Sequence, residues 1–462
     1  MTTRSNSAAR DIEAVLHPYT NLATHRTNGP LVIARGKGIY VYDEQGKSYI
    51  EGLAGLWCAA LGFADEELVE AAVEQMRKLP FYHQFSGKSH DPGIALAEKL
   101  KELAPVPMSK VFFTNSGSEA NDTQVKLAWY YNNARGRPDK KKIISRRNAY
   151  HGVTVASASL TGLPSVHRDF DLPIAGILHT DCPHYWRNGE PGESEEAYTA
   201  RVLRSLQALI DHEGAETIAA FIAEPVIGAG GVIVPPRGYF PAVRALLEAH
   251  DILLIDDEVI CGFGRTGHPF GAQAFDIVPD SISVAKALSS AYLPIAAVMI
   301  DEHIYQACLD ESRKLGAFSH GFTYSGHPVS AAVALKTLEI YERRRIFQHA
   351  RDVAPKFQTR LKALADHPLV GETRGIGLIG AVELVADKAT KRSFSPPVTV
   401  APKGAVLCQE EGLIVRPILE CLAMCPPLII TEAEIDEMFD RLTRALDRLE
   451  AHVSREKLRD NS

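Results

Sequence analysis

Short apolar runs rich in β-branched residues alternate with stretches of helical periodicity through the middle of this chain, and this alternation limits the fold most strongly. The runs that predict strands are Lys110–Asn115, Lys142–Arg146, Gly176–Thr180, Ile218–Ala223, Ile252–Asp256, Ser281–Ala285 and Ala296–Ile300. The helical stretches between them include Ser118–Asn133, Ala197–His212 and Tyr239–His250. Short strands connected by helices are typical of a parallel sheet covered on both faces. We therefore predict an α/β fold with a seven-stranded, mostly parallel sheet.

The two ends of the chain carry elements of their own. They are a β-hairpin over Ile39–Ile50 with its turn at Glu44–Lys47, and long helices over Val329–Arg343 and Glu432–Glu450. A length of 462 residues suggests two or three domains. We expect residues 70–325 to form a large domain, and residues 1–69 and 326–462 to form a smaller α/β domain from both chain ends.

Charge and composition exclude several classes of protein. The net charge is -7, with 50 basic and 57 acidic residues well mixed, which argues against a nucleic-acid or anionic-membrane surface. No apolar run approaches the roughly 18 residues of a membrane span, and Met1–Ser7 lacks the apolar stretch of a secretory signal. Seven scattered cysteines, with no zinc-like spacing around Cys421 and Cys425, are typical of reduced thiols. We expect a cytoplasmic enzyme without a metal site.

Polar residues gather where the predicted strands end. These residues are Thr114–Glu119 after the first strand, Tyr150–Gly152 beyond the second, Glu224 after the fourth, Asp256–Glu258 after the fifth and Lys286 after the sixth. In open α/β sheets, ligands bind outside the carboxyl ends of the strands. One such residue would mean little, but five groups on one edge predict a binding site.

Lys286 and Asp257 point to a particular cofactor. Burying a charged side chain at a strand end costs free energy, so we expect one there only where function requires it. Pyridoxal phosphate requires both groups, because an amine forms a Schiff base with it and a carboxylate holds a proton on its pyridine nitrogen. Strand alternation puts Asp257 and Val259 on one face of their strand and Asp256 and Glu258 on the other. We expect Asp257 and Val259 to face the pyridine ring together.

The phosphate and the ring of such a cofactor also have candidate partners. Ser116, Gly117 and Ser118 precede a predicted helix, whose N-terminus favours an anion, although a serine there is often only a helix cap. Tyr150 can lie flat on a pyridine ring, although an aromatic residue in this place is more often part of a core. His151 is a polar neighbour of Tyr150, and a lone histidine is usually structural. Together with Lys286, these residues favour a phosphate site.

A competing pattern lies close by. Gly262, Gly264 and Gly267 match the G-x-G-x-x-G sequence of nicotinamide dinucleotide sites and follow a strand. That pattern should open a helix that binds the pyrophosphate, yet here it runs into His268-Pro269. The acidic residues just before it would also repel phosphate. An NAD-dependent oxidoreductase is therefore the remote alternative.

Seven stretches of the chain resemble one known family. They are Gly55–Cys58, Thr114–Ala120, Tyr150–Gly152, Ala223–Gly231, Asp257–Gly267, Ala285–Pro294 and Gly321–Pro328. The chain resembles the class III, fold-type I pyridoxal-phosphate aminotransferases, and among them the pyruvate-dependent ω-transaminases. The likeness extends from about His17 to the C-terminal helix. It implies transfer of an amino group from an amine or ω-amino acid to an α-keto acid, with pyruvate giving alanine.

The resemblance also implies roles for single residues. Lys286 looks like the Schiff-base lysine and Asp257 like the partner of the pyridine nitrogen. The Ser116-Gly117-Ser118 segment would bind the phosphate, and Tyr150 and Val259 would enclose the ring. Thr323 would reach the phosphate of a neighbouring subunit, which implies a homodimer, or a tetramer, with shared active sites.

The substrate side is implied in the same way. Trp57 would line the substrate pocket, and Arg416 resembles a mobile arginine that grips a substrate carboxylate and swings away for an uncharged amine. Glu224 resembles a residue that partners such an arginine. For Arg416, the simpler interpretation is a surface ion pair.

Three alanines depart from the family pattern. Ala287, Ala291 and Ala296 stand where we expect glycine, and alanine tolerates a positive φ poorly. Any of them with a positive φ would put the shape of the loop after Lys286 in question. Decarboxylases and aminomutases of the same fold share the lysine and the aspartate, so the sequence leaves these activities open.

Overall fold

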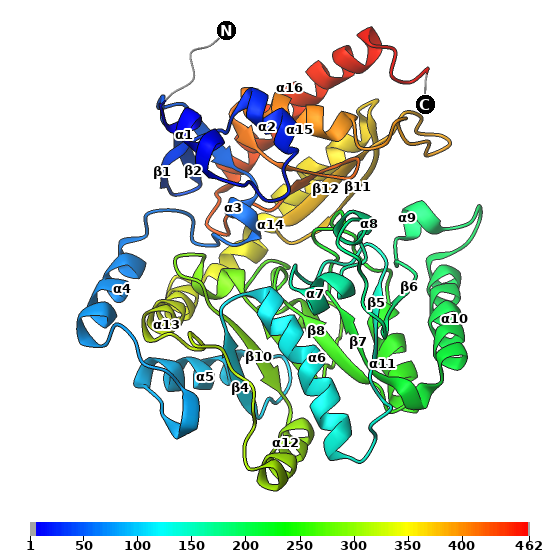
Figure 1. Ribbon diagram of the computed structural model, residues 1–462. Coiled ribbons are helices and arrows are strands. Elements are labelled where there is room, and N and C mark those ends of the chain that lie inside the picture. The colour runs from blue at the N-terminus through cyan, green and yellow to red at the C-terminus, as the bar shows by residue number, and fades with distance from the viewer. Residues whose placement is uncertain (1–5, 461–462) are drawn as a thin grey trace.

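A computed structural model describes residues 6–460 of the chain. Residues 1–5, which include most of the stretch judged not to be a secretory signal, lie outside the described residues. A large sheet flanked by helices forms the lower part of the molecule in Figure 1, and segments from both chain ends form the upper part. This arrangement confirms the predicted α/β fold with a smaller part built from both ends of the chain.

The lower part is built on the predicted seven-stranded sheet, in the order β4-β10-β9-β8-β7-β5-β6. Its strands are β4 (Lys110–Thr114), β5 (Lys142–Arg146), β6 (Ile177–Thr180), β7 (Ile218–Ala223), β8 (Leu253–Asp257), β9 (Ser281–Val284) and β10 (Ala296–Ile300). Only β10 runs against its neighbours, β4 and β9. Residues 285–295 between β9 and β10 are too few for the helical crossover that a parallel connection needs.

Alternate residues of the central strands pack against helices on opposite faces of the sheet. On β7, Phe221 belongs to an apolar cluster with residues of α10 and α11, whereas Ile222 belongs to a second cluster with residues of α6 and α12. The helices of this part are α5 (Asp91–Leu103), α6 (Gly117–Ala134), α7 (Val155–Leu160), α8 (Pro164–His167), α9 (Tyr185–Asn188), α10 (Glu195–Glu213), α11 (Tyr239–Ala249) and α12 (Glu302–Leu315). Short 3-10 turns lie at η1 (Phe85–Gly87), η2 (Ala215–Thr217), η3 (Gly271–Ala274) and η4 (Lys286–Ser289). Burial on both faces explains why these strands are almost wholly apolar.

Two four-stranded sheets form the upper part. The first contains β1 (Ile33–Lys37), β2 (Tyr40–Asp43), β3 (Ser48–Glu51) and β13 (Leu413–Ile414), and the second contains β11 (Val370–Ile376), β12 (Ile379–Leu384), β15 (Cys421–Met424) and β14 (Arg416–Ile418). The predicted hairpin is present as the antiparallel pair β2 and β3. Because β13 pairs with β3, the C-terminal segment completes a sheet begun by the N-terminal segment.

Helices from both ends surround these sheets, namely α1 (Asn6–Ala14), α2 (Leu22–Asn28), α3 (Ala54–Trp57), α14 (Ile346–Ala363), α15 (Val400–Glu410) and α16 (Glu432–Arg455), with the short turn η5 (Leu364–Asp366). Two more helices, α4 (Glu66–Lys78) and α13 (Pro328–Arg343), pack against each other and lie beside α5 in the lower part (Figure 1). The last helix begins at a capping box in which Thr431 and Glu434 satisfy each other's backbone N–H groups. It extends five residues beyond the predicted end at Glu450.

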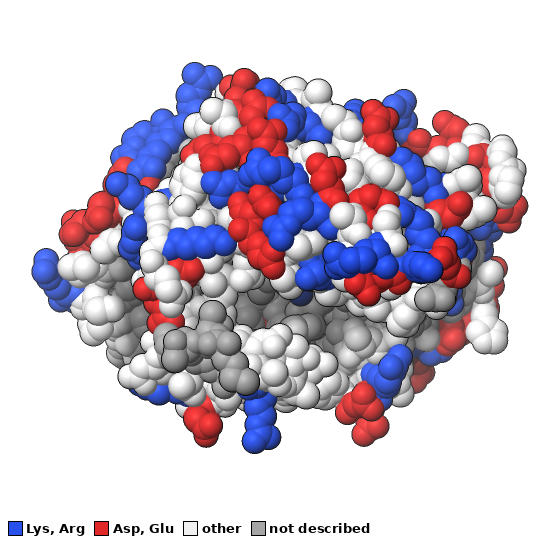
Figure 2. Space-filling view, turned by 90° about the horizontal axis from the view of Figure 1, so that it is seen from above, with Lys and Arg blue, Asp and Glu red and all other residues white. Residues whose placement is uncertain are grey.

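The surface mixes charges of both signs. Figure 2 shows lysines and arginines interspersed with acidic residues over the face seen from above. Within residues 6–460, we find no helix that is both long enough and apolar enough to cross a membrane.

The G-x-G-x-x-G segment opens no helix. Residues 262–267 run through turns, and the next element is the four-residue turn η3. Arg265, inside the segment, donates from Nη1 to the carbonyl oxygens of Leu378 and Pro426 at 3.0 and 2.6 Å. The glycines therefore shape a loop that joins the two parts of the molecule, and the dinucleotide hypothesis loses its structural basis.

Candidate active site

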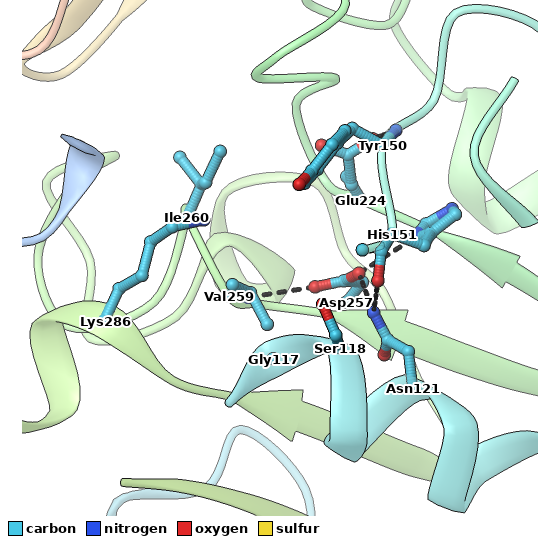
Figure 3. Close-up of a pocket in the computed structure, with 11 residues that line it drawn as sticks. Gly117, Ser118, Asn121, Tyr150, His151, Glu224, Asp257, Val259, Ile260 and Lys286 are labelled. Carbon is cyan, nitrogen blue, oxygen red and sulfur yellow. Dashed lines mark hydrogen bonds and ion pairs between the residues drawn. The ribbon is translucent and has the colours of Figure 1, made fainter. Parts of the chain in front are cut away.

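A cavity of about 150 Å³ lies at the carboxyl edge of the seven-stranded sheet (Figure 3). Its lining contains eight predicted site residues: Gly117, Ser118, Tyr150, His151, Glu224, Asp257, Val259 and Lys286. It also contains Asn121, Gly152 and Ile260, to which the sequence assigned no role. The predicted residues Ser116, Trp57, Arg416 and Thr323 lie outside the lining. Asp257 and Val259 line the cavity whereas Asp256 and Glu258 do not, as strand alternation predicts.

Lys286 extends into the cavity from the start of η4, directly beyond β9. Figure 3 shows it on one side, with Asp257, His151 and Asn121 gathered on the other. Its backbone is left-handed, with φ of 51°, a conformation that costs a non-glycine residue about 1 kcal/mol. Burial lowers the pKa of its amine, and the negative charge of Asp257 opposes that shift. A buried amine of lowered pKa is suited to nucleophilic chemistry.

Asp257, the last residue of β8, is held by three hydrogen-bond donors. His151 Nδ1 and Asn121 Nδ2 both donate to Oδ2 at 2.7 Å, and the Val259 amide donates to Oδ1 at 3.1 Å. Asn121 Nδ2 also donates to the His151 carbonyl oxygen at 2.7 Å. The carboxylate is 2% exposed, so its direction into the cavity is fixed by these contacts.

Asn121 is a site residue that the sequence reasoning missed. It lies one helical turn after Gly117 on α6, so the two residues share the face of the helix that meets the cavity. This i, i+4 spacing was a usable signal. The nearby His151 Nε2 is buried without a hydrogen-bond partner in the described part of the chain. A polar group bound in the cavity would supply the hydrogen-bond partner that this nitrogen lacks.

The N-terminus of α6 also borders the cavity. Ser116 caps this 18-residue helix, because its Oγ accepts from the Glu119 amide at 3.2 Å. Gly117 has little room for a side chain, since an added Cβ would lie 3.0 and 3.1 Å from the Val259 methyl groups. Ser118 Oγ accepts from the Val153 amide at 3.1 Å. Free amides and the dipole of a long helix make this end suitable for a phosphate.

Within the described residues, the carboxylate of Glu224 accepts hydrogen bonds from backbone amides and not from an arginine side chain. Its Oε1 accepts from the Tyr150 amide at 2.9 Å, and its Oε2 accepts from the Gly228 amide at 3.0 Å. Burial raises the pKa of this carboxyl. Among residues 6–460, Glu224 forms no ion pair with Arg416, so its observed contacts serve to position Tyr150.

Arg416, at the start of β14, lies half-buried near Tyr150 and Tyr19. Its Cζ is 6.0 Å from the centre of the Tyr19 ring, and no carboxylate in the described part of the chain pairs with it. Burial and the hydroxyl of Tyr19 both raise the pKa of Tyr150. Burial lowers the pKa of Arg416, which indicates that its charge lacks a compensating anion. Nothing in the local sequence marks Tyr19, because only the folding back of the N-terminal segment brings it here.

Trp57 and Thr323 do not line the cavity. Trp57 is 2% exposed and has a left-handed backbone with φ of 66°. It belongs to an apolar cluster that also contains Ile260, which does line the cavity. Thr323 is exposed on the loop between α12 and α13.

The three alanines of the departing pattern differ in backbone conformation. Ala291 is left-handed, with φ of 63°, next to Ser290 with φ of 48°. Ala287 and Ala296 have ordinary φ values, so glycine is not needed at either place. Left-handed backbone in this loop therefore occurs at Lys286 and at the two residues just after η4, Ser290 and Ala291.

The residues present fit pyridoxal phosphate. An amine, a carboxylate held by three donors and a helix N-terminus all border one cavity, as the cofactor's aldehyde, pyridine nitrogen and phosphate require. The unpartnered His151 Nε2 is consistent with a bound polar group beside Asp257.

Comparisons with known proteins agree with this chemistry. Residues 22–446 match the family described as Aminotransferase class-III. A tomato (Solanum lycopersicum) protein named gamma aminobutyrate transaminase 3, chloroplastic, is 51% identical over 453 residues, which cover 97% of this chain and 87% of the relative.

Two solved structures are similarly close. The omega transaminase from Pseudomonas jessenii in complex with PMP is 55% identical, with a TM-score of 0.96, and the match covers 97% of this chain and 99% of that one. A transaminase with L-ala is 57% identical, with a TM-score of 0.90, over 92% of this chain and 100% of that one.

Proposed function

The chain belongs to the class-III aminotransferases, which use pyridoxal phosphate, and we propose that it moves an amino group from an amine or an ω-amino acid to pyruvate. The observation that carries this proposal is Arg416, a half-buried cation beside the cavity for which residues 6–460 provide no carboxylate partner. A substrate carboxylate would supply the missing anion. Amine donors without a carboxylate must use the same cavity in the other half of the reaction.

Pyridoxal phosphate, when bound, supplies an electron sink for charge that develops at the amino-bearing carbon of the substrate. Lys286 would anchor the cofactor, and its Nζ, when free, would take the proton from that carbon. Asp257 would keep the pyridine nitrogen protonated, and its three donors hold it in place for that task. The amides at Gly117 and Ser118 would hold the phosphate, and Tyr150 and Val259 would hold the ring.

The names of the similar proteins support both substrates. The tomato relative is named for γ-aminobutyrate, which is an ω-amino acid. One solved relative is named for its complex with L-alanine, the product that pyruvate would give. Arg416 and the hydroxyls of Tyr19 and Tyr150 provide the polar side of the substrate site, and the cluster containing Trp57 provides the apolar side.

We further propose a homodimer. Large apolar side chains are exposed together around η1 and the Thr323 loop, namely Phe81, Tyr82, Phe85 and Tyr324, with exposures of 38 to 59%. Such a patch is typical of an interface. A second copy on this face would bring its own Thr323 toward the phosphate end of the cavity. The cytoplasmic location expected from the cysteines, all seven of them free, stays a prediction.

A donor and acceptor panel tests the function. Purified holoenzyme is supplied with γ-aminobutyrate, β-alanine, a diamine and an arylalkylamine, each with pyruvate or 2-oxoglutarate, while alanine, glutamate and CO₂ are measured. The proposal expects alanine from at least one donor and no CO₂. Glutamate as the dominant product would contradict the choice of acceptor. Carbon dioxide release without alanine would show a decarboxylase of the same fold.

A further inference from the structure

Three groups of histidine and acidic side chains in residues 6–460 could supply metal ligands. In the group of His184, Glu372 and Glu383, Arg374 Nη1 already pairs with both carboxylates at 2.6 Å. In the group around Asp280, Arg244 Nη1 pairs with that carboxylate at 2.8 Å. An arginine in place neutralises the charge that would attract a cation.

The third group is Asp11, His17 and His25, and no lysine or arginine in the described residues forms an ion pair with its carboxylate. His17 Nε2 lies 2.8 Å from Asp11 Oδ1 and 3.0 Å from Oδ2, and His25 Nε2 lies 3.1 Å from Oδ1. The two imidazole rings are 4.1 Å apart between centroids. Two nitrogens and one carboxylate therefore converge on one small region.

We propose that Asp11, His17 and His25 bind a Zn²⁺ ion. Two imidazole nitrogens and one carboxylate oxygen are the three-ligand set that zinc accepts, with water in the fourth position. Ligands about 2.1 Å from a tetrahedral ion lie roughly 3.4 Å from one another. Nitrogen-to-oxygen distances of 2.8 to 3.1 Å would need to open by only a few tenths of an ångström.

The ion would cross-link a segment that packing holds weakly. Ala8 is the one buried residue in α1, and α2 has none. Asp11 belongs to α1, His25 belongs to α2, and His17 lies in the connection between them. The same connection carries Tyr19, which contacts Tyr150 and lies near Arg416. Zinc would therefore stabilise the segment that brings Tyr19 to the substrate side of the cavity.

Direct metal binding tests the site without using activity. Metal-free holoenzyme is dialysed against Zn²⁺, and bound zinc is measured per chain in the parent protein, in His17→Ala/His25→Ala and in Asp11→Asn. The expected result is one Zn²⁺ per chain in the parent, loss to background in the double variant and at least about tenfold weaker binding in Asp11→Asn, which removes the only full ligand charge. His212→Gln, which changes an exposed histidine on α10, should bind like the parent.

Two results would overturn the site: no zinc bound to the parent, or the same stoichiometry and affinity in the double variant. Circular dichroism tests whether each variant is folded. If the double variant does not fold, the zinc affinity of Asp11→Asn still decides whether the site exists. Amide hydrogen exchange tests the cross-link, because Zn²⁺ should slow exchange in residues 15–29 of the parent and not of the double variant. Unchanged exchange in zinc-loaded parent would overturn the stabilising role.

Discussion

The cofactor side and the substrate side of this cavity are built in different ways. On the cofactor side, Asp257 receives three hydrogen bonds from side chains and backbone anchored in β8, α6 and the segment after β5. On the substrate side, Arg416 has no anionic partner in the described residues, and it lies with Tyr19 near Tyr150. One side belongs to the central sheet, and the other is assembled from the two ends of the chain.

This difference suggests a division of labour. Groups that must keep one geometry in every turnover lie where a rigid sheet edge and a long helix can fix them. Groups that must accept two unlike substrates lie on segments with fewer packing constraints. The two sides should therefore respond differently to substitution.

The largest effect should follow removal of the amine. Lys286→Ala should lower turnover at least about 10³-fold in both half-reactions, because anchoring and proton transfer depend on the same nitrogen. Cofactor should remain bound, as judged by absorbance after gel filtration. Lys336→Ala, on the surface of α13, is the matched control. Near-normal turnover in Lys286→Ala would contradict the assignment of Lys286 as the cofactor-binding lysine.

Asp257→Asn should lower both half-reactions by a similar factor, about 10² to 10³. The neutral amide keeps the shape of the side chain but cannot balance a protonated pyridine nitrogen. Single-turnover rates with an amine and with pyruvate measure the two factors separately. Asp276→Asn changes an exposed aspartate with φ of 53°, which asparagine also tolerates, and should have no effect. Unequal losses of rate in the two half-reactions of Asp257→Asn would contradict the proposed division between the cofactor side and the substrate side.

Glu51 offers a test of the segment that leads to Trp57. Its Oε1 accepts from the Leu53 amide at 3.0 Å, and burial raises its pKa from 4.5 to about 7. The folded chain thus binds this proton more tightly than the unfolded chain does. The associated stability is complete below about pH 4.5 and is lost as the pH rises through about 7.

Glu51→Gln should therefore match the parent near pH 4.5 and exceed it above pH 7, by up to about 3 kcal/mol in the free energy of unfolding. Urea unfolding across this pH range makes the comparison, with Glu44→Gln in the exposed hairpin turn as the control. A constant difference at all pH values would show that folding does not raise the pKa of Glu51.

The smallest effect concerns the loop after Lys286. Ala291→Gly should stabilise the protein by about 1 kcal/mol, because glycine removes the penalty of a left-handed backbone. Ala287→Gly, in the same loop with an ordinary φ, should destabilise it by about 0.5 to 1 kcal/mol. Thermal unfolding of both variants measures the sign of each change in stability. A change of the same sign in both variants would contradict the left-handed backbone at Ala291.

Much of the cofactor side could be predicted from the sequence because its signals are local. Three of these signals can be recognised without knowledge of the fold. They are a buried strand that ends in Asp257, a strand followed by Lys286, and a serine-rich helix start. The antiparallel direction of β10 was missed, although the short connection from β9 indicates it. Asn121 was also within reach, one turn beyond Gly117.

The substrate side was less predictable because it depends on the folding together of distant segments. Tyr19 comes within reach of Tyr150 only through the path of the N-terminal segment. Resemblance suggested Glu224 as a partner for Arg416, but the structure gives its carboxylate to two backbone amides. The backbone conformation of Ala291 depends on tertiary packing, so no local pattern reveals it. The proposed domain boundaries at residues 69 and 325 stay predictions.

The most direct test of the division is a pair of single-turnover measurements on Arg416→Ala. Reaction with pyruvate should slow by about 10- to 100-fold, as expected when a charged hydrogen-bond partner worth about 1.5 to 3 kcal/mol is lost. Reaction with an arylalkylamine should change less than about twofold, and Arg313→Ala on the surface of α12 should change neither. Equal losses in both half-reactions of Arg416→Ala would contradict a substrate side that adapts independently of the cofactor side.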